Sequence, residues 1–202
     1  MQKKKIKSII GTVLAIAILV SALIFGLANY NKVDYTVDFT VYLEGPCNFE
    51  IVANPNTRIL KITAKNEKSK ELISGVSFEG ASVSHAINVL TNEMVKAKML
   101  NKDTNLLLAF EYSADSNLPL NYYEQFEADI YSIIKINEAK STLFAVGQKH
   151  TDELETIAKE NDISVGRAIF IKEIETRNRA YVREVGINTI AKLPLDELCK
   201  LY

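Results

Sequence analysis

The sequence predicts an α/β fold, more narrowly α+β, in which a single transmembrane helix precedes a small β-sheet packed by amphipathic helices, with a helical carboxyl-terminal end. Three observations support this fold class. Residues 37–65 contain three strand-like runs separated by two turn segments. Apolar side chains recur at helical spacing in residues 82–100 and 120–138. An uncharged apolar stretch occupies residues 8–28.

The amino-terminal stretch at residues 8–28 is long enough to cross a bilayer. At about 1.5 Å per residue a helix of this length spans roughly 31 Å, close to the thickness of the hydrocarbon core. Lysines dominate residues 1–7, and lysine-rich flanks favour the cytoplasmic side. We therefore predict a cytoplasmic tail at 1–7, a transmembrane helix at 8–28, and a single-pass protein of the cell membrane with a cytoplasmic amino terminus and an extracytoplasmic carboxyl-terminal domain.

A cleaved secretory signal is the alternative for the same stretch, because small residues up to Ala28 provide a plausible peptidase site. Both interpretations place the remainder of the chain outside the cytoplasm. We expect an extracytoplasmic α/β domain at residues 33–148 and a helical carboxyl-terminal subdomain at 149–202.

The three strand-like runs are residues 37–43, 49–52 and 59–63. In the first run, apolar and polar side chains alternate, which predicts a strand with one buried face. The segments between the runs, 44–47 and 54–57, are rich in residues that favour turns. Each segment is therefore either a plain turn or a reactive backbone site.

The rest of the chain alternates between helix and strand. The predicted elements are a turn or short helix at 66–74, a helix at 82–100, a buried strand at 105–112, a helix at 120–138, a strand at 142–146, helices capped by Thr151 and Ser164, and a last short helix at 196–202. A strand, helix, strand order therefore runs through the middle of the chain.

Composition and spacing argue against several classes of function. The chain has 24 basic and 25 acidic residues, with no basic stretch typical of nucleic-acid binding after the amino terminus. His85 and His150 belong to no zinc-binding or serine-activating spacing. We expect no nucleic-acid partner, no catalytic, cofactor or metal site, and no conventional enzyme. Cys47 and Cys199 either pair or remain separate thiols, and we favour separate thiols.

Several short motifs occur in the order known from one protein family. They comprise residues 41–43, 44–48, 49–51, Asn54, 58–60, Ala64, Asn66, Lys70, 80–82 and 158–168. Together they resemble the extracytoplasmic middle region of RsgI-like anti-sigma factors, which contains V-S-L-D-V-N-P-S-I-E-L, N-R-F-x-R-V-I and A-x-N-x-x-G-K, followed by G-K-S-x-x-E-A and A-x-x-x-G-I-S-x-G-K-A. The likeness covers most of residues 33–172.

The resemblance also implies the position of a reaction. Members of the family cleave their own Asn-Pro bond, and the two fragments stay paired in one sheet. The ungapped register places that bond at Pro46-Cys47, inside the segment Glu44, Gly45, Pro46, Cys47 and Asn48, with Glu44 matching the family's Asp. Because the Asn-Pro pair is absent there, we expect the self-cleavage motif to be degenerate and the chain to stay intact.

Asn54-Pro55 is the less favoured cleavage site. Its use would require a shifted register that loses the matches at Glu50, Arg58 and Ile59, and the pair suits a turn. A third option is attack by a Cys47 thiolate on the preceding carbonyl, although the sequence places no evident base nearby.

Family members carry a cytoplasmic sigma-binding domain before the membrane helix, where this sequence has residues 1–7. We therefore expect no direct sigma-factor binding by this tail. The leading hypothesis is an accessory or degenerate RsgI-like regulator in envelope signalling, with the membrane and an envelope or regulatory protein as partners. One alternative is a surface-displayed scaffold or wall-binding module without a signalling role. Another is one part of a split regulator whose sigma-binding part is encoded separately.

Overall fold

A five-stranded mixed sheet organises residues 34–113, 115–116 and 121–202, which are the residues described by the computed structural model. The strands are β1 (Phe39–Glu44), β2 (Phe49–Ala53), β3 (Ile59–Ala64), β4 (Asn105–Tyr112) and β5 (Thr142–Lys149). Their order is β3-β2-β1-β4-β5, and every neighbouring pair is antiparallel except the parallel pair β4 and β5. Helix α4 (Asn121–Ile136) connects the two parallel strands.

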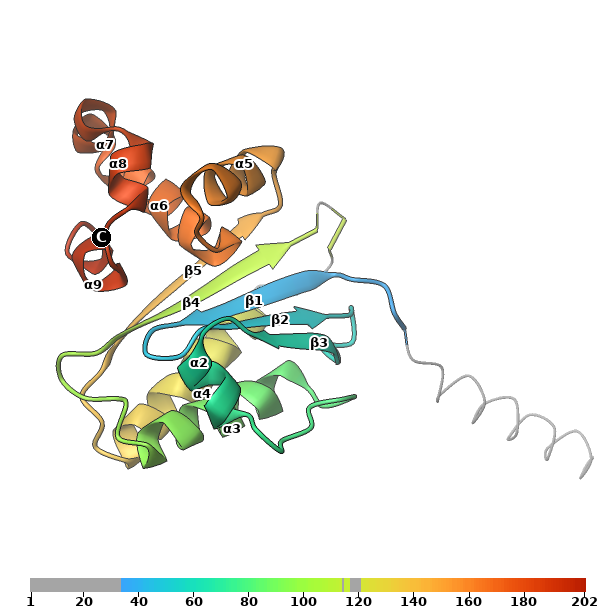
Figure 1. The fold of residues 1–202 in the computed structure, drawn as a ribbon. Coiled ribbons are helices and arrows are strands. Elements are labelled where there is room, and N and C mark those ends of the chain that lie inside the picture. Colours follow the sequence, from blue (N-terminus) through green and yellow to red (C-terminus); the bar gives the residue numbers. More distant parts are fainter. Residues whose placement is uncertain (1–33, 114, 117–120) are drawn as a thin grey trace, which may run out of the picture. The chain divides into compact units, whose positions relative to one another are not determined.

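Helices cover both faces of this sheet (Figure 1). The first face packs against α2 (Glu67–Leu72), α3 (Val83–Lys96) and α4. The second face packs against α5 (Asp152–Asn161), α6 (Val165–Arg177), α7 (Arg179–Val185), α8 (Ile187–Ala191) and α9 (Leu195–Cys199). Two separate hydrophobic cores result, one on each face.

Strand β1 shows how the two layers share the sheet. Phe39, Val41 and Leu43 point into the first core, as their alternation predicts. Tyr42 points into the second core and is 6% exposed. The prediction of a single buried face was therefore wrong, because α6 covers the side on which the alternating polar residues lie. The buried strand predicted at 105–112 is confirmed by β4, whose side chains enter both cores.

Local signals placed several helix ends correctly. The Thr151 hydroxyl accepts a hydrogen bond from Leu154 N at 3.4 Å, and the Ser164 hydroxyl accepts one from Arg167 N at 2.9 Å. These contacts confirm the predicted caps of α5 and α6. Helices α7 and α8 were not predicted. The domain boundary at residue 149 stays a prediction.

The membrane part of the predicted fold class is corrected. Within the described ranges, no helix combines the length and the apolar character needed to cross a membrane. The longest of these helices, α4, has 16 residues, whereas a transmembrane helix needs about 20. The segment predicted to span, residues 8–28, lies outside the described residues, as do the tail at 1–7 and the alternative cleavage after Ala28.

The fold class supported by the structure is therefore α+β, with a five-stranded mixed sheet between helical layers. The predicted localisation as a single-pass membrane protein had rested on residues 1–28, and it is corrected together with the transmembrane helix. The membrane as a partner stays a prediction.

Candidate functional site

The segment that the resemblance singled out, Glu44 to Asn48, forms the connection between β1 and β2. Gly45 N donates a hydrogen bond to Asn48 Oδ1 at 3.1 Å, which closes the turn. A Cβ atom on Gly45 would lie 2.9 Å from the backbone oxygen of Asn105. Because a backbone atom cannot move aside, only glycine fits at this position.

The short helix α2 and its cap contact this turn. Asn66 caps α2 by accepting a hydrogen bond from Ser69 N at 2.8 Å. Its amide nitrogen lies 3.4 Å from the carbonyl oxygen of Pro46, to which it donates. The Ser69 hydroxyl accepts a hydrogen bond from Asn48 N at 2.7 Å. The carbonyl of the bond between residues 46 and 47 thus receives one long hydrogen bond from a neutral donor.

Cys47, on the other side of that bond, is fully buried. Its Sγ atom lies 3.5 Å from Met99 Sδ. Burial raises the pKa of the Cys47 thiol and outweighs the lowering effects of Ser69 and Lys68. A protonated, enclosed thiol is a poor nucleophile, so this environment suits a packed side chain rather than a reactive one.

Glu44, the charged residue of the segment, is buried, with 3% of its surface exposed. The Ser164 hydroxyl donates to its Oε1 atom, and Arg167 Nη2 lies 3.4 Å from its Oε2 atom. Both partners belong to the amino-terminal end of α6, within the segment 158–168 that also carries the family likeness. The structure therefore brings together two motif segments that are far apart in the sequence.

Gly166 makes this approach possible. A Cβ atom there would lie 2.4 Å from Tyr42 Cβ, so any side chain at this position would push α6 away from β1. Next to this contact, a cavity of about 450 Å³ is lined by charged groups of both signs, among them Glu50, Lys65 and Arg167. Lys65 Nζ and Glu50 Oε2 form an ion pair at 2.6 Å.

The second predicted position, Asn54-Pro55, lies in the turn between β2 and β3. Asn54 Oδ1 accepts hydrogen bonds from Asn56 N at 3.0 Å and from Arg58 N at 2.9 Å. Thr57 N donates to the Asn54 carbonyl at 2.9 Å. Residues 54–58 therefore have the hydrogen bonds of a turn. That the chain stays intact at the bonds 46–47 and 54–55 remains a prediction.

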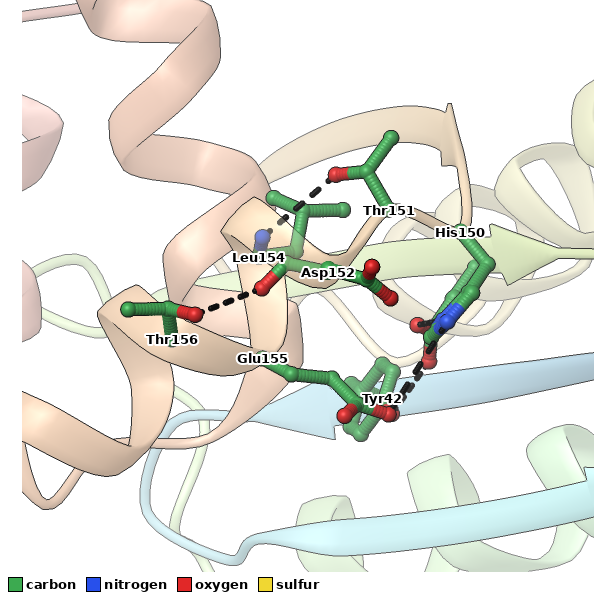
Figure 2. A network of polar contacts seen from close by, with 8 residues as sticks. Tyr42, His150, Thr151, Asp152, Leu154, Glu155 and Thr156 are labelled. Carbon is green, nitrogen blue, oxygen red and sulfur yellow. Dashed lines mark hydrogen bonds and ion pairs between the residues drawn. The ribbon is translucent and has the colours of Figure 1, made fainter.

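A further polar cluster was missed by sequence reasoning. Glu111 of β4 accepts hydrogen bonds from the Tyr42 hydroxyl at 2.8 Å and from His150 Nδ1 at 2.7 Å. Figure 2 shows Tyr42 of β1 and His150 of the connection between β5 and α5 converging, with Glu155 beside them. The hydrogen bond to Glu111 raises the pKa of His150. No spacing in the sequence links Tyr42, Glu111 and His150, since they lie far apart along the chain, on β1, on β4 and after β5.

Cys47 and Cys199 are both free thiols, which confirms the interpretation that they do not pair. Among the described residues, no group of three or more histidine, cysteine or acidic side chains is arranged to hold a metal ion.

Comparison with known proteins identifies a family. The sequence model of the family described as the anti-sigma factor RsgI-like central domain matches residues 47–173. The matched range includes Cys47, Asn66, Ser164 and Arg167, and it begins just after Glu44 to Pro46. None of the curated proteins matches the chain.

Proposed function

The chain belongs to the family of the anti-sigma factor RsgI-like central domain, and from this premise we propose that it is a degenerate member that regulates signalling as one uncleaved chain. Family membership supports a regulatory role and a regulatory protein as partner. The proposal adds that regulation does not depend on cleavage between residues 46 and 47.

The observation that carries the proposal is the environment of that bond. In the ungapped register of the resemblance, Cys47 takes the place of the family's proline. Its thiol is buried and has a raised pKa. Glu44, the nearest carboxylate in the sequence, is already engaged by Ser164 and Arg167. The Asn-Pro pair that the family cleaves is absent at this bond, so the chain lacks the residues between which cleavage would occur.

The first experiment asks whether the chain is whole. We expect the purified protein to give one band on denaturing electrophoresis and one intact mass. Fragments that separate between residues 46 and 47, or between residues 54 and 55, would contradict the proposal.

The second experiment asks whether the intact chain regulates. A sigma-dependent reporter is measured in cells that lack the protein, in cells that overproduce it, and in cells with the wild-type level. We expect opposite responses to loss and to excess. An unchanged reporter would favour the alternative of a scaffold or wall-binding module without a signalling role.

A further inference from the structure

Strand β5 lies at one edge of the sheet and pairs only with β4 among the strands of the described residues. A cavity of about 520 Å³ lies along it, and three consecutive residues, Ala145, Val146 and Gly147, line this cavity. Successive side chains of a strand point to opposite faces of a sheet. A cavity that touches all three residues must therefore open at the edge of the strand.

The hydrogen bonds at the two ends of β5 show which backbone groups face this edge. Thr142 N donates to the carbonyl of Thr104 at 3.1 Å, and His150 N donates to the carbonyl of Tyr112 at 2.9 Å. In a parallel ladder, alternate residues bond to the same neighbouring strand. The backbone N–H and C=O groups of the even-numbered residues of β5 thus point toward β4, and those of the odd-numbered residues point toward the edge of the sheet.

A side-chain contact supports this assignment. The Tyr131 hydroxyl of α4 donates to the carbonyl of Leu143 at 3.4 Å, so the Leu143 carbonyl does face the edge. For Ala145 and Gly147, no partner of the backbone N–H or C=O occurs within the described part of the chain. Unpaired N–H and C=O groups along an edge form a template for another strand.

Side chains on both faces of the sheet flank the β5 edge and form the two walls of the cavity. Tyr123 of α4 stands on one face, and Tyr202 with Arg177 stands on the other. Arg177 lies 3.8 Å from the centre of the Tyr202 ring and bonds to Glu173 at 2.9 Å, which fixes this wall. Tyr123 and Tyr202 both line the cavity of about 520 Å³, so the space beside β5 is bounded on both faces of the sheet.

We propose that this edge groove, formed by β5 with Tyr123, Arg177 and Tyr202, binds an extended peptide segment of a partner protein, which joins the sheet as a sixth strand. Main-chain hydrogen bonds to Ala145 and Gly147 provide the affinity. The aromatic walls favour apolar side chains at alternate positions of the peptide. The inference adds a partner surface to the proposed function, and it does not depend on whether the bond between residues 46 and 47 is intact.

The test begins with a phage-displayed library of random heptapeptides, selected against the immobilised 202-residue chain. Enriched peptides are synthesised, and their binding is measured by fluorescence anisotropy. Amide hydrogen exchange, resolved to single residues, then locates the site. We expect a bound peptide to slow the exchange of the Ala145 and Gly147 amides more than that of their even-numbered neighbours, which are already bonded to β4.

Two variants at residue 147 distinguish binding through main-chain hydrogen bonds from binding through side-chain contacts alone. Gly147→Pro removes the edge-facing N–H without removing a bond to β4, and we expect binding to weaken about tenfold or more. Gly147→Ala is the matched control, because the added Cβ would meet no atom closer than 3.6 Å. We expect it to bind within about twofold of the wild type, since the N–H is kept.

A peptide series gives a result even if Gly147→Pro fails to fold. Each selected peptide is N-methylated at its odd positions or at its even positions, and only the set that faces β5 should abolish binding. Equal effects of both sets would overturn the proposal. So would wild-type binding by Gly147→Pro, exchange protection elsewhere in the chain, or a library without enriched peptides. None of these outcomes bears on the reporter response, so the proposed function is tested separately.

Discussion

The hydroxyl of Ser164 donates a hydrogen bond to the buried carboxylate of Glu44, which lies 120 residues earlier in the chain. The same carboxylate pairs with Arg167 at 3.4 Å. Glu44 ends β1 and Ser164 caps α6, so this contact joins the second helical layer to the strand that leads into the turn at residues 45–48. The candidate site therefore depends on the packing of α6.

Removing the Glu44 carboxylate should destabilise the protein substantially. Glu44→Ala leaves the partly buried Arg167 and the Ser164 hydroxyl without their acceptor, and we expect the free energy of unfolding to fall by about 2 to 4 kcal/mol. Urea denaturation followed by circular dichroism measures this change. Glu50→Ala is the control, because the more exposed pair with Lys65 should contribute only about 0 to 1 kcal/mol. Equal effects of the two substitutions would contradict the structural role of Glu44.

The close approach of α6 to β1 predicts an unequal response at two glycines. Gly166→Ala would place a Cβ atom 2.4 Å from Tyr42 Cβ, and we expect it to cost about 2 kcal/mol or more in the free energy of unfolding. Gly147→Ala meets only ordinary contacts and should stay within about 1 kcal/mol of the wild type. Thermal and urea denaturation compare the two variants. A Gly166→Ala protein as stable as the wild type would show that α6 does not approach β1 this closely.

His150 should titrate above its ordinary range because of its hydrogen bond to Glu111. NMR titration of the imidazole in the wild type measures this pKa. In Glu111→Gln the pKa should fall toward the unperturbed value of about 6.5. Glu155→Gln should change it less, since Glu155 Oε1 lies 3.9 Å from His150 Nε2. If Glu111→Gln leaves the pKa unchanged, the hydrogen bond is not its cause.

The same pKa shift gives a sign for the pH dependence of stability. A raised pKa in the folded state means that the charged imidazole is favoured by folding. The stabilising contribution of His150 is fully present below its pKa of about 6.5 in the unfolded state, and it is lost as the pH rises through its pKa in the folded state. The stability difference between the wild type and His150→Gln should therefore shrink across this interval. A difference that grows with pH would have the wrong sign.

Restoring the family's residues at the turn tests the register of the resemblance. We expect the double variant Pro46→Asn with Cys47→Pro to yield two fragments on denaturing electrophoresis, separated between residues 46 and 47. Each single variant should stay intact, because neither recreates the Asn-Pro bond. The fragments should co-elute under native conditions, since β1 and β2 pair from Phe39 with Ala53 to Leu43 with Phe49. An intact double variant would place the family's bond elsewhere.

Local patterns in the sequence determined much of the secondary structure. Alternation identified β1, the apolar run identified β4, and hydroxyl caps placed the starts of α5 and α6. The collinear motifs identified the family, which the match at residues 47–173 confirms. These signals are readable because each arises from residues within a few positions of one another. The short helices α7 and α8 have no comparably strong pattern and were missed.

Only the tertiary structure shows which residues of those elements contact each other. The sequence did not indicate that α6 covers the second face of β1, that Ser164 and Arg167 engage Glu44, or that Glu111 joins Tyr42 to His150. Nor did it indicate that β5 ends the sheet with Ala145 and Gly147 turned outward. The physical reason is the same in each case. Periodicity and helix capping depend on residues within one element. These contacts depend instead on which elements pack against each other, and that packing is determined by the apolar surface buried over the whole sheet.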